Sequence, residues 1–436
     1  MCSFSGLGVF GVFSQHLTRR AFLGAVSLAA AASVAHAQTA AITGSITSIA
    51  PKLAVAGKLA TKTEFLADRQ EAAMVTAGSV RALEGAIQLY EEFVAGGGWP
   101  SVGKGKLEKD VKSDLVVTLR KRLVAEGYLP IEDMFVEAAD VFDPNITEAV
   151  KFFQTSHGIA PSGKVDDRTR AELNITARAR LQTLRENYPR VGEYALDLHE
   201  RNILVNIPSA QLETVEFGKV RSRHNVVVGK RDRPSPALKS VVSDINFNPY
   251  WNAPASIVQK DLVPKFLKDP TIFEQMNIRI FDGVGGPEID PYTVDWVNTD
   301  PERYHFRQEP GEGNALATMK INFANKYMVY MHDTPHRELF EVNARFESSG
   351  CVRVDKVSDV VNWILGGQDG IDATEIEMIT ASQERYDVKV LNPPDVRFMY
   401  LTAWATEDGR INFRPDIYAL DGKGFVLGQP RASRGI

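Results

Sequence analysis

Hydrophobic and polar residues alternate along this chain in two different ways, and the change falls near residue 200. Before that point, apolar side chains recur three and four residues apart, which places them on one face of an α-helix. After it, short runs rich in valine and isoleucine are separated by turn residues, a pattern typical of β-strands. We therefore expect an α+β protein of several domains, with a helical part followed by a mostly β part.

The helical part divides into three segments. Residues 63–110 are expected to form a helical scaffold, with a helix from about Thr63 to Ala95 that the glycines at 96–98 end. Residues 111–175 hold three short amphipathic helices, which predicts a small three-helix module that packs against its neighbours. Residues 176–200 are charged and are expected to be a helical linker. The alternative for the 111–175 module is a helical spacer that binds no ligand.

The β part is expected to fill residues 201–385 and to continue as C-terminal strands and a tail in residues 386–436. Strands are predicted at 203–207, 212–216, 225–228, 243–247, 278–281, 327–331, 388–391, 398–401 and 411–413. Residues 246–310 interrupt this pattern because they are rich in Pro, Asn and Asp and hold two Trp. A stretch of that length is too long for a plain loop, which predicts a subdomain that caps the β scaffold.

The first 37 residues differ from the rest because they contain no Asp, Glu or Lys. A twin arginine, Arg19-Arg20, precedes an apolar run at 25–34, and residues 35–37 have the small-x-small form of a signal peptidase site. Residues 1–37 are therefore expected to be a twin-arginine signal peptide that directs the protein to the periplasm, with residues 38–62 as a linker. The alternatives are an uncleaved N-terminal anchor and a wrongly chosen start codon.

Charge and cysteine content narrow the chemistry. The formal net charge of −5 gives no sign of the basic footprint that is typical of nucleic-acid-binding proteins. The chain has two cysteines, Cys2 and Cys351, and cleavage after Ala37 leaves Cys351 alone. A single thiol cannot form an internal disulfide, and in an oxidising compartment it is a liability unless it has a function. The alternative is a buried, inert cysteine.

A candidate catalytic pair follows the predicted strand at 327–331. His332 lies at the end of this strand, and Cys351 lies within residues 348–353, which read S-S-G-C-V-R. An imidazole can remove the proton of a thiol and return it to a leaving or attacking amine. The small residues ahead of Cys351 can aim backbone N–H groups at the oxyanion of a tetrahedral intermediate. Arg353 either binds a substrate carboxylate or braces the loop through an ion pair.

Two alternatives compete with this pair. His336 is a second candidate for the base, but it follows Pro335 and is expected in a loop. A zinc site formed by His332, Asp333, His336 and Cys351 is the other alternative. Pro335 argues against zinc because it breaks the helix that histidines four residues apart would share, and no second cysteine is available.

These residues resemble the active-site signature of the L,D-transpeptidases, whose catalytic domain is called YkuD. The resemblance rests on H-D-T at 332–334 and S-S-G-C-V-R-V at 348–354, and it extends over roughly residues 80–420 to the large YcbB-like branch. The longer match includes F-N-P-Y-W-N at 247–252, V-D-W at 294–296 and Y-L-T-A-W-A at 400–405. L-R-K-R-L at 119–123, A-V-K-F-F-Q at 149–154 and S-G-K-V-D at 162–166 resemble a three-helix peptidoglycan-binding domain, which usually has Asp-Gly where this chain has Ser162-Gly163.

The resemblance implies roles for individual residues and requires no cofactor and no metal. Cys351 matches the nucleophile and His332 the general base, which the backbone carbonyl of Asp333 orients. The backbone amides of Gly350 and Cys351 match the oxyanion hole, and Arg353 matches a site arginine. Tyr330, Ser349 and Trp251 are expected to contact the substrate.

The implied reaction is the formation of 3-3 cross-links in peptidoglycan through a thioester on Cys351. Donor and acceptor stem peptides are the expected partners, with cell-wall synthesis proteins as further candidates and no nucleic acid. Carbapenem-type β-lactams are expected to acylate the same thiol. The alternatives are an L,D-carboxypeptidase, a transpeptidase that attaches proteins or D-amino acids to stems, and a wall-binding scaffold protein whose thiol is idle.

Overall fold

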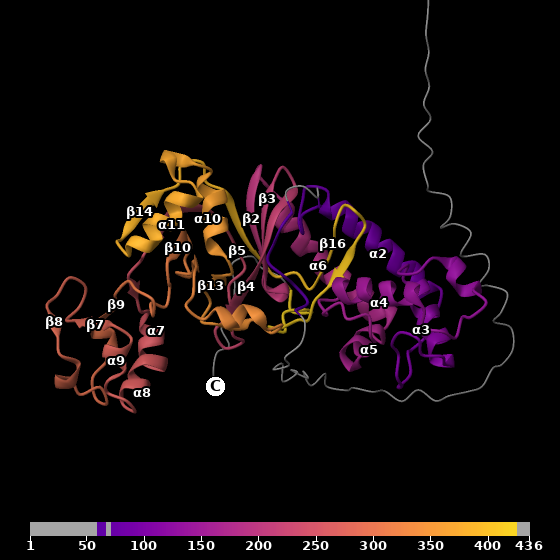
Figure 1. The fold of residues 1–436 in the computed structure, drawn as a ribbon, viewed down its shortest axis with the longest axis horizontal. Helices are drawn as coiled ribbons and strands as arrows, with labels where there is room; N and C mark the ends of the chain where they lie inside the picture. Colours follow the sequence, from indigo (N-terminus) through magenta and orange to yellow (C-terminus); the bar gives the residue numbers. More distant parts are fainter. Residues whose placement is uncertain (1–58, 67–70, 425–436) are drawn as a thin grey trace, which may run out of the picture.

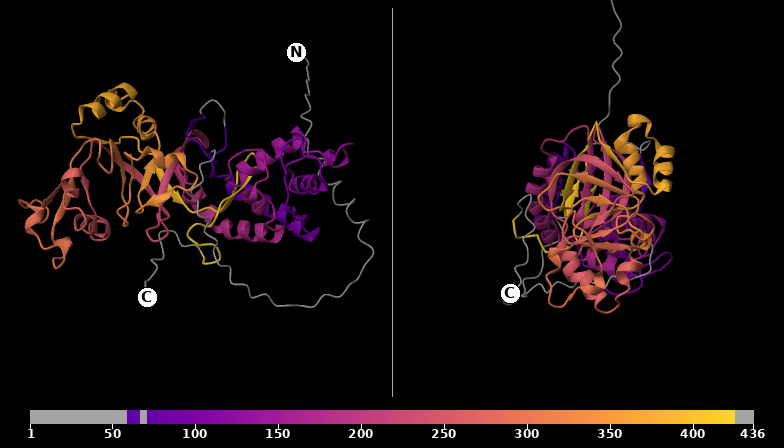
Figure 2. Two further views of the ribbon diagram at one scale, coloured as in Figure 1. Left: turned by 60° about the horizontal axis from the view of Figure 1, so that its bottom comes forward. Right: turned by 90° about the vertical axis from the view of Figure 1, so that its left-hand side faces the viewer.

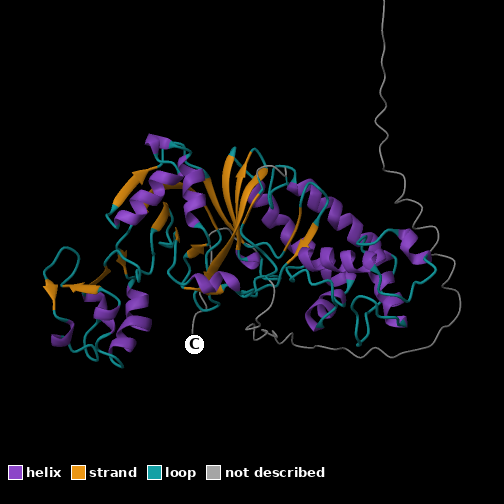
Figure 3. Ribbon diagram, in the orientation of Figure 1, coloured by secondary structure: helices purple, strands orange, loops and turns teal. Residues whose placement is uncertain are grey.

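The computed structural model describes residues 59–66 and 71–424, so the predictions for residues 1–37 and for most of the 38–62 linker lie outside the described residues. A large β sheet occupies the middle of the molecule, with a helical end on one side and a small cap on the other (Figure 1). The views in Figure 2 and the colouring in Figure 3 show the same separation. The predicted α+β class, with a mostly β catalytic part and a helical module, is confirmed.

Five helices build the helical end: α2 (Ser79–Ala95), α3 (Asp114–Ala125), α4 (Pro144–Ser156), α5 (Asp167–Leu173) and α6 (Ala177–Ala195). Helices α3, α4 and α5 enclose an apolar core that includes Leu119 and Phe153. Each of these three begins at a polar side chain that accepts a backbone N–H, as the sequence pattern of helix starts requires. Helices α2 and α6 pack together and cover one face of the sheet through a second core.

The helix predicted from Thr63 is wrong at its N-terminal end. Glu64–Phe65 forms strand β1 and pairs with β4 (Lys219–Gly229), and α2 begins only at Ser79. Tertiary contacts override the helical spacing because Thr63 Oγ1 donates to Asp355 at 2.6 Å and accepts a backbone N–H from β4. This segment therefore belongs to the sheet and not to the scaffold helix.

The central sheet closes on itself. Its path contains β4, β13 (Val352–Val354), β11 (Met331–His332), β10 (Met319–Phe323), β5 (Leu238–Phe247), β15 (Asp395–Met399), β2 (Arg201–Asn206) and β3 (Gln211–Glu216), and β3 pairs with β4 again. Strands β12 (Phe346–Ser348) and β14 (Tyr386–Lys389) attach to β4 and β5. The apolar core of the sheet combines alternate strand residues with one side of α10 (Val357–Leu365) and with Ile376 of α11 (Ala373–Ser382), two helices that the sequence analysis missed.

The cap is built from the Pro- and Asp-rich stretch and has a fold and a core of its own. Its strands run in the order β6 (Trp251–Asn252), β9 (His305–Gln308), β7 (Ile278–Phe281) and β8 (Glu288–Ile289). Its helices are α7 (Ala255–Ile257), the π-helical turn η3 (Val258–Leu262), α8 (Val263–Phe266) and α9 (Ile272–Gln275). The rings of Phe266, Phe273, Trp296 and Phe306 pack together at its centre.

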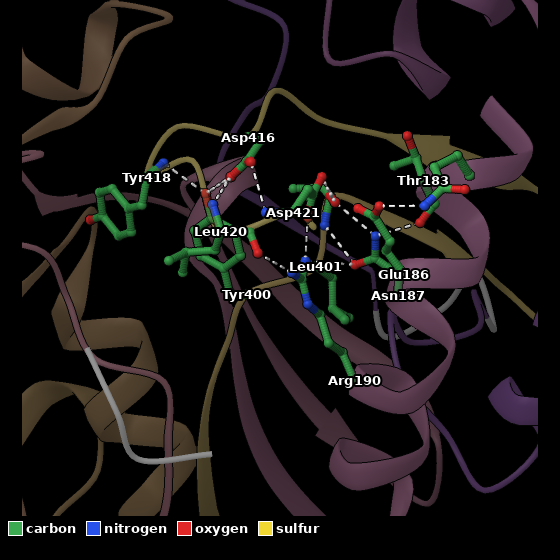
Figure 4. A network of polar contacts seen from close by, with 12 residues as sticks. Thr183, Glu186, Asn187, Arg190, Tyr400, Leu401, Asp416, Tyr418, Leu420 and Asp421 are labelled. Carbon is green, nitrogen blue, oxygen red and sulfur yellow. Dashed lines mark hydrogen bonds and ion pairs between the residues drawn. The ribbon is translucent and has the colours of Figure 1, made fainter. Parts of the chain in front are cut away.

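The C-terminal segment ties the helical end to the sheet. Hairpin strands β16 (Ala403–Ala405) and β17 (Ile411–Phe413) pack on α2 and α6, and residues 414–421 then return to the sheet. In the network of Figure 4, Asp416 accepts hydrogen bonds from Tyr400 Oη at 2.5 Å and from the backbone N–H groups of Leu420 and Asp421. Arg190 of α6 donates to Asp421 at 2.6 Å, which joins this turn to the helix.

Short 3-10 turns complete the chain: η1 (Ile131–Phe135), η2 (Ile207–Ser209), η4 (Pro291–Thr293), η5 (Pro301–Arg303), η6 (Arg337–Glu341) and η7 (Gln368–Gly370). Within residues 59–66 and 71–424, no helix has the length and apolar character needed to cross a bilayer.

Candidate active site

Three neighbouring strands carry the candidate residues. Strands β11 and β13 are parallel, with Met331 opposite Val352 and His332 opposite Arg353. Strand β10 lies on the other side of β11 and places Lys320 opposite His332. Met331 and Val352 face the apolar interior of the sheet. Because strand residues alternate between faces, His332, Arg353 and Lys320 project together from the outer face.

Cys351 lies just before β13, on the same outer face. The backbone N–H of Val352 donates to the carbonyl of Tyr330 at 3.0 Å, which sets Cys351 beside Tyr330. The Tyr330 hydroxyl lies within hydrogen-bonding reach of the Cys351 thiol and of the Trp251 indole. The Tyr330 ring meets the His332 ring edge-on, with 5.5 Å between centroids. The structure therefore gathers Cys351, His332, Tyr330 and Trp251, although Trp251 belongs to the cap.

The strand predicted at 327–331 is wrong over most of its length. Strand β11 covers only Met331–His332, so His332 lies within the strand. Asn325 Oδ1 accepts the backbone N–H groups of Tyr327 and Val329, which bends the chain into a turn. Met328 has a φ of 57° and is 80% exposed, so this apolar residue points away from the core.

Hydrogen bonds on both sides brace the loop that carries Cys351. Gly350 has a φ of 114°, a conformation that favours glycine. Its carbonyl accepts a hydrogen bond from Ser235 Oγ at 2.8 Å, and its N–H donates to Ser348 Oγ at 3.2 Å. Ser348 Oγ in turn donates to the carbonyl of Cys351 at 2.5 Å. The Gly350 N–H, which we expected in an oxyanion hole, therefore already has an acceptor in this state.

Ser349 lies exposed at the rim of the site, where it meets the cap through Arg233. Arg233 Nη1 donates to Ser349 Oγ at 3.0 Å, and Nη2 donates to Asp261 of η3 at 3.1 Å. One side chain thus links the loop that carries Cys351 to the cap. Nothing in the sequence around Arg233 indicated this role.

The environment of His332 keeps its imidazole neutral. Burial, followed by repulsion from Arg353 and Lys320, lowers the pKa of His332 to about 3. The backbone carbonyl of Asp333 opposes this shift, but within the described residues Nδ1 has no hydrogen bond of regular geometry. The Asp333 carboxylate is engaged elsewhere, because its Oδ2 accepts a hydrogen bond from Thr318 Oγ1 at 2.6 Å. A neutral imidazole is the form that can accept a proton.

The Cys351 thiol is also neutral in this state. Burial raises its pKa, while hydrogen bonds with Tyr330 and the positive charges of Lys320 and Arg353 act against that shift. At neutral pH the two groups are therefore a thiol and an imidazole, and not a thiolate and an imidazolium. The sulfur has to lose its proton as it attacks, which is the arrangement of general-base catalysis.

Lys320 is, after Arg233, a second site residue that the sequence analysis missed. It lies in β10, a strand that no prediction covered, and its Nζ lies 4.4 Å from the centroid of the Tyr330 ring. The signal that could have found it is the alternation of polar Lys320 and Asn322 with the apolar residues Met319, Ile321 and Phe323.

His336 stands apart from this cluster. It is exposed in the loop after Pro335, and its Nδ1 lies 3.2 Å from Glu338 Oε1. In the part of the chain that the structure describes, no group of three or more His, Cys, Asp or Glu side chains is arranged to hold a metal ion.

Comparisons with known proteins place two regions of the chain in families. Residues 200–377 match the model of the L,D-transpeptidase catalytic domain, YkuD. Residues 112–173 match a model described as "Putative peptidoglycan binding domain". A Haemophilus influenzae protein named "Putative L,D-transpeptidase" is 37% identical over 254 residues, which are 58% of this chain and 50% of that relative. The chain thus spans about half the length of this curated relative.

Solved L,D-transpeptidase structures are also similar to this chain, at low identity. The structure from Xylanimonas cellulosilytica is 13% identical with a TM-score of 0.22, covering 68% of this chain and 98% of that chain. The structure from Stackebrandtia nassauensis is 12% identical with a TM-score of 0.24, covering 69% of this chain and 96% of that chain. Both superposition scores are low, so the family assignment rests on the sequence matches. Residues 200–377 therefore belong to the L,D-transpeptidase (YkuD) family, and a domain of the peptidoglycan-binding family precedes them.

Proposed function

We propose that this protein is a peptidoglycan L,D-transpeptidase that acts in the periplasm through a thioester on Cys351. The observation that carries the proposal is the outer face of β11 and β13, where the thiol of Cys351 lies within reach of Tyr330 and the ring of Tyr330 meets the neutral imidazole of His332. The match of this region to the YkuD family supports it. Export by the twin-arginine route rests on the pattern in residues 1–37.

The first half-reaction acylates Cys351. His332 takes the thiol proton, and the sulfur attacks the carbonyl between the L-centre of diaminopimelate and D-Ala in a tetrapeptide stem. The backbone N–H of Cys351 stabilises the oxyanion, joined by that of Gly350 once it leaves Ser348 Oγ. Collapse breaks the C–N bond, His332 returns the proton to the departing amine, and D-Ala leaves.

The second half-reaction transfers the acyl group. The side-chain amine of a second stem attacks the thioester, and His332 accepts a proton from that amine. The C–S bond then breaks, and the Cys351 thiolate recovers its proton from His332. The product is a 3-3 cross-link. No nucleotide is consumed because the thioester retains the energy of the original amide bond.

The cap, Ser349 and the helical module are each assigned a role in substrate binding from their positions. The cap contacts the site through Trp251 and Tyr330, so we assign it the role of covering the bound donor stem. Ser349 stands at the exposed rim of the site, where Arg233 links it to the cap. The helical module keeps the enzyme on the wall polymer, as its family match indicates.

Incubating the purified full-length protein with disaccharide tetrapeptides tests the proposal. Mass spectrometry is expected to show release of D-Ala and a dimer joined 3-3, and Cys351→Ala is expected to abolish both. A tripeptide without any dimer would overturn the transferase and leave an L,D-carboxypeptidase. D-amino acids or a lysine-bearing protein, added as competing acceptors, would show whether acceptors other than stems collect the acyl group.

Acylation by a carbapenem tests the assignment of nucleophile and base separately. Wild type is expected to carry one adduct, which peptide mapping places on Cys351. His332→Ala is expected to abolish the adduct, whereas the exposed His336→Ala is expected to leave most of it. The reverse pattern would reassign the base, and an adduct elsewhere would reassign the nucleophile.

A further inference from the structure

Two cations flank His332 in a single row across three strands. Lys320 lies opposite His332 on β10, and Arg353 lies opposite it on β13. Both side chains therefore project from the outer face, one on each side of the imidazole. Both also act as positive charges on the Cys351 thiol.

Neither cation has a close carboxylate partner among the described residues. Asp244 and Asp387 act on Lys320, and Glu338 and Glu347 on Arg353, only as charges at a distance and without a hydrogen bond. The Nε of Arg353 is buried and has no hydrogen-bond partner in the described part of the chain.

Two other arginines of low exposure are matched by carboxylates, whereas the buried Arg345 donates instead to backbone carbonyls and to Thr61 Oγ1. Arg120 meets Asp133 at 3.2 Å and Asp143 at 2.7 Å, and Arg223 meets Glu213 at 2.9 Å. Removing a cation from water without a partner raises its free energy, so such groups are usually paired. Two unmatched cations beside a nucleophile therefore indicate that an anion from outside the chain completes the site.

The position of Lys320 defines where such an anion lies. Its Nζ lies 4.4 Å from the centroid of the Tyr330 ring, and the Tyr330 hydroxyl reaches the Cys351 thiol. An anion held by Lys320 is therefore a near neighbour of the sulfur. The thiol and the imidazole are both neutral, so neither of them supplies the negative charge that would neutralise Lys320.

We propose that Lys320, together with Arg353, receives a carboxylate of the donor stem and so determines which donors the enzyme accepts. This inference rests on the proposed function. A tetrapeptide stem offers carboxylates on its D-Ala, on the D-centre of diaminopimelate and on D-Glu, all of the same chemical class. A bound carboxylate also offsets the two positive charges that oppose protonation of His332, so the base becomes stronger once the donor is in place.

Alkylation of Cys351 by two small reagents tests the cation site without any stem peptide. Iodoacetate carries a carboxylate and iodoacetamide does not, so the ratio of their rates reports attraction of an anion. Any change in thiol reactivity affects both rates and cancels in the ratio. In the full-length protein, Lys320→Met is expected to lower this ratio roughly tenfold, the size of one charge-assisted contact.

Lys326→Met is the matched control because Lys326 is exposed and its Nζ lies 5.3 Å from another tyrosine ring, that of Tyr327. Lys326→Met is expected to leave the ratio of the two alkylation rates at the wild-type value. Lys320→Arg keeps the positive charge and is expected to show a ratio close to that of wild type. An equal ratio in wild type and Lys320→Met would overturn the proposal. Lys320→Arg reports on the charge even if the methionine variant fails to fold.

Donors with one carboxylate amidated identify the group that is bound. Wild type is expected to show a raised KM for one amide among the D-Ala, diaminopimelate and D-Glu forms, and Lys320→Met is expected to lose that discrimination. Equal use of every amidated donor by wild type would overturn the inference. Failure of wild type to use even the unmodified stem would instead overturn the proposed function, and the alkylation ratio would still report on the cation site.

Discussion

Arg233 and Asp261 join the loop after β4 to the cap by a two-point ion pair, in which Nη2 lies 3.1 Å from Oδ1 and Nη1 binds Oδ2. The same Nη1 donates to Ser349 Oγ at 3.0 Å. The position of the cap and the position of the loop ahead of Cys351 thus depend on one guanidinium group. Bidentate pairs of this kind fix geometry more strongly than single contacts do.

Asp261→Asn is expected to loosen the cap without damaging the nucleophile. Because the Asp261 side chain is 38% exposed, the global free energy of unfolding is expected to fall by less than about 1 kcal/mol. Hydrogen exchange is expected to rise in residues 255–266, and KM for the donor stem is expected to increase severalfold. Alkylation of Cys351 by iodoacetamide is expected to stay near the wild-type rate.

Asp282→Asn provides the control, since it breaks another exposed ion pair of the cap, with Arg303 at 3.3 Å. It is expected to leave both the exchange of residues 255–266 and the donor KM unchanged. An Asp261→Asn protein with wild-type exchange and KM would show that Arg233 does not hold the cap.

The pH dependence of Cys351 alkylation follows from the two neutral groups. Burial raises the pKa of the thiol above its ordinary value of about 8.5, so the thiol is protonated at neutral pH. The rate with iodoacetamide is therefore expected to keep rising beyond about pH 8.5. With the pKa of His332 near 3, no inflection is expected near pH 6.5, the value of an ordinary histidine. A plateau already reached at about pH 7 would indicate a thiolate–imidazolium pair instead.

The sequence predicts the parts of the site that lie in continuous segments, and it misses those that strand pairing brings together. His332 and the S-S-G-C-V-R segment stand out because small and reactive residues follow each other along the chain. Arg233 reaches Ser349 across 116 positions, and Lys320 reaches the site only because β10 pairs with β11 in one register. Such contacts depend on the topology of the sheet and leave no local pattern.

The errors in secondary structure have the same origin. The apolar run at 327–331 has the composition of a strand, but the side chain of Asn325 bends it into a turn. The residues around Thr63 have helical spacing, but hydrogen bonds with β4 draw them into the sheet. In each case one polar side chain outweighs the preference of the apolar residues near it.

Ser235→Ala is expected to weaken catalysis through the backbone of the nucleophile loop. Ser235 is buried, its Oγ donates to the Gly350 carbonyl at 2.8 Å, and it accepts the N–H of Gly229 at 2.9 Å. Losing both bonds is expected to lower the free energy of unfolding by about 1–2 kcal/mol. Since the substitution leaves the thiol in place but frees the loop, kcat is expected to fall more than KM changes.

Ser240→Ala is the matched control for Ser235→Ala, because Ser240 Oγ also donates to a backbone carbonyl, that of Ala324 at 2.7 Å, on the exposed side of β5. Urea denaturation and steady-state kinetics measure both variants. If the two serine variants lower kcat to the same extent, the brace at Gly350 has no catalytic role.

Gln154 holds together the turn at Ser162-Gly163, so its loss is expected to unfold the peptidoglycan-binding module first. It is fully buried, and its amide group bonds Ser162 Oγ at 3.0 Å, Thr169 Oγ1 at 3.0 Å and the Gly163 N–H at 2.9 Å. Gln154→Leu leaves these groups unpaired, which is expected to cost about 2–3 kcal/mol. Hydrogen exchange of residues 144–173 and sedimentation with purified sacculi are the measurements.

The matched control is Gln182→Leu on α6, which is exposed and loses only a contact with Glu186. It is expected to leave both the hydrogen exchange and the sedimentation unchanged. Because this core is separate from that of the sheet, carbapenem acylation of Cys351 is expected to persist in Gln154→Leu, and its loss would mean that the two parts unfold together.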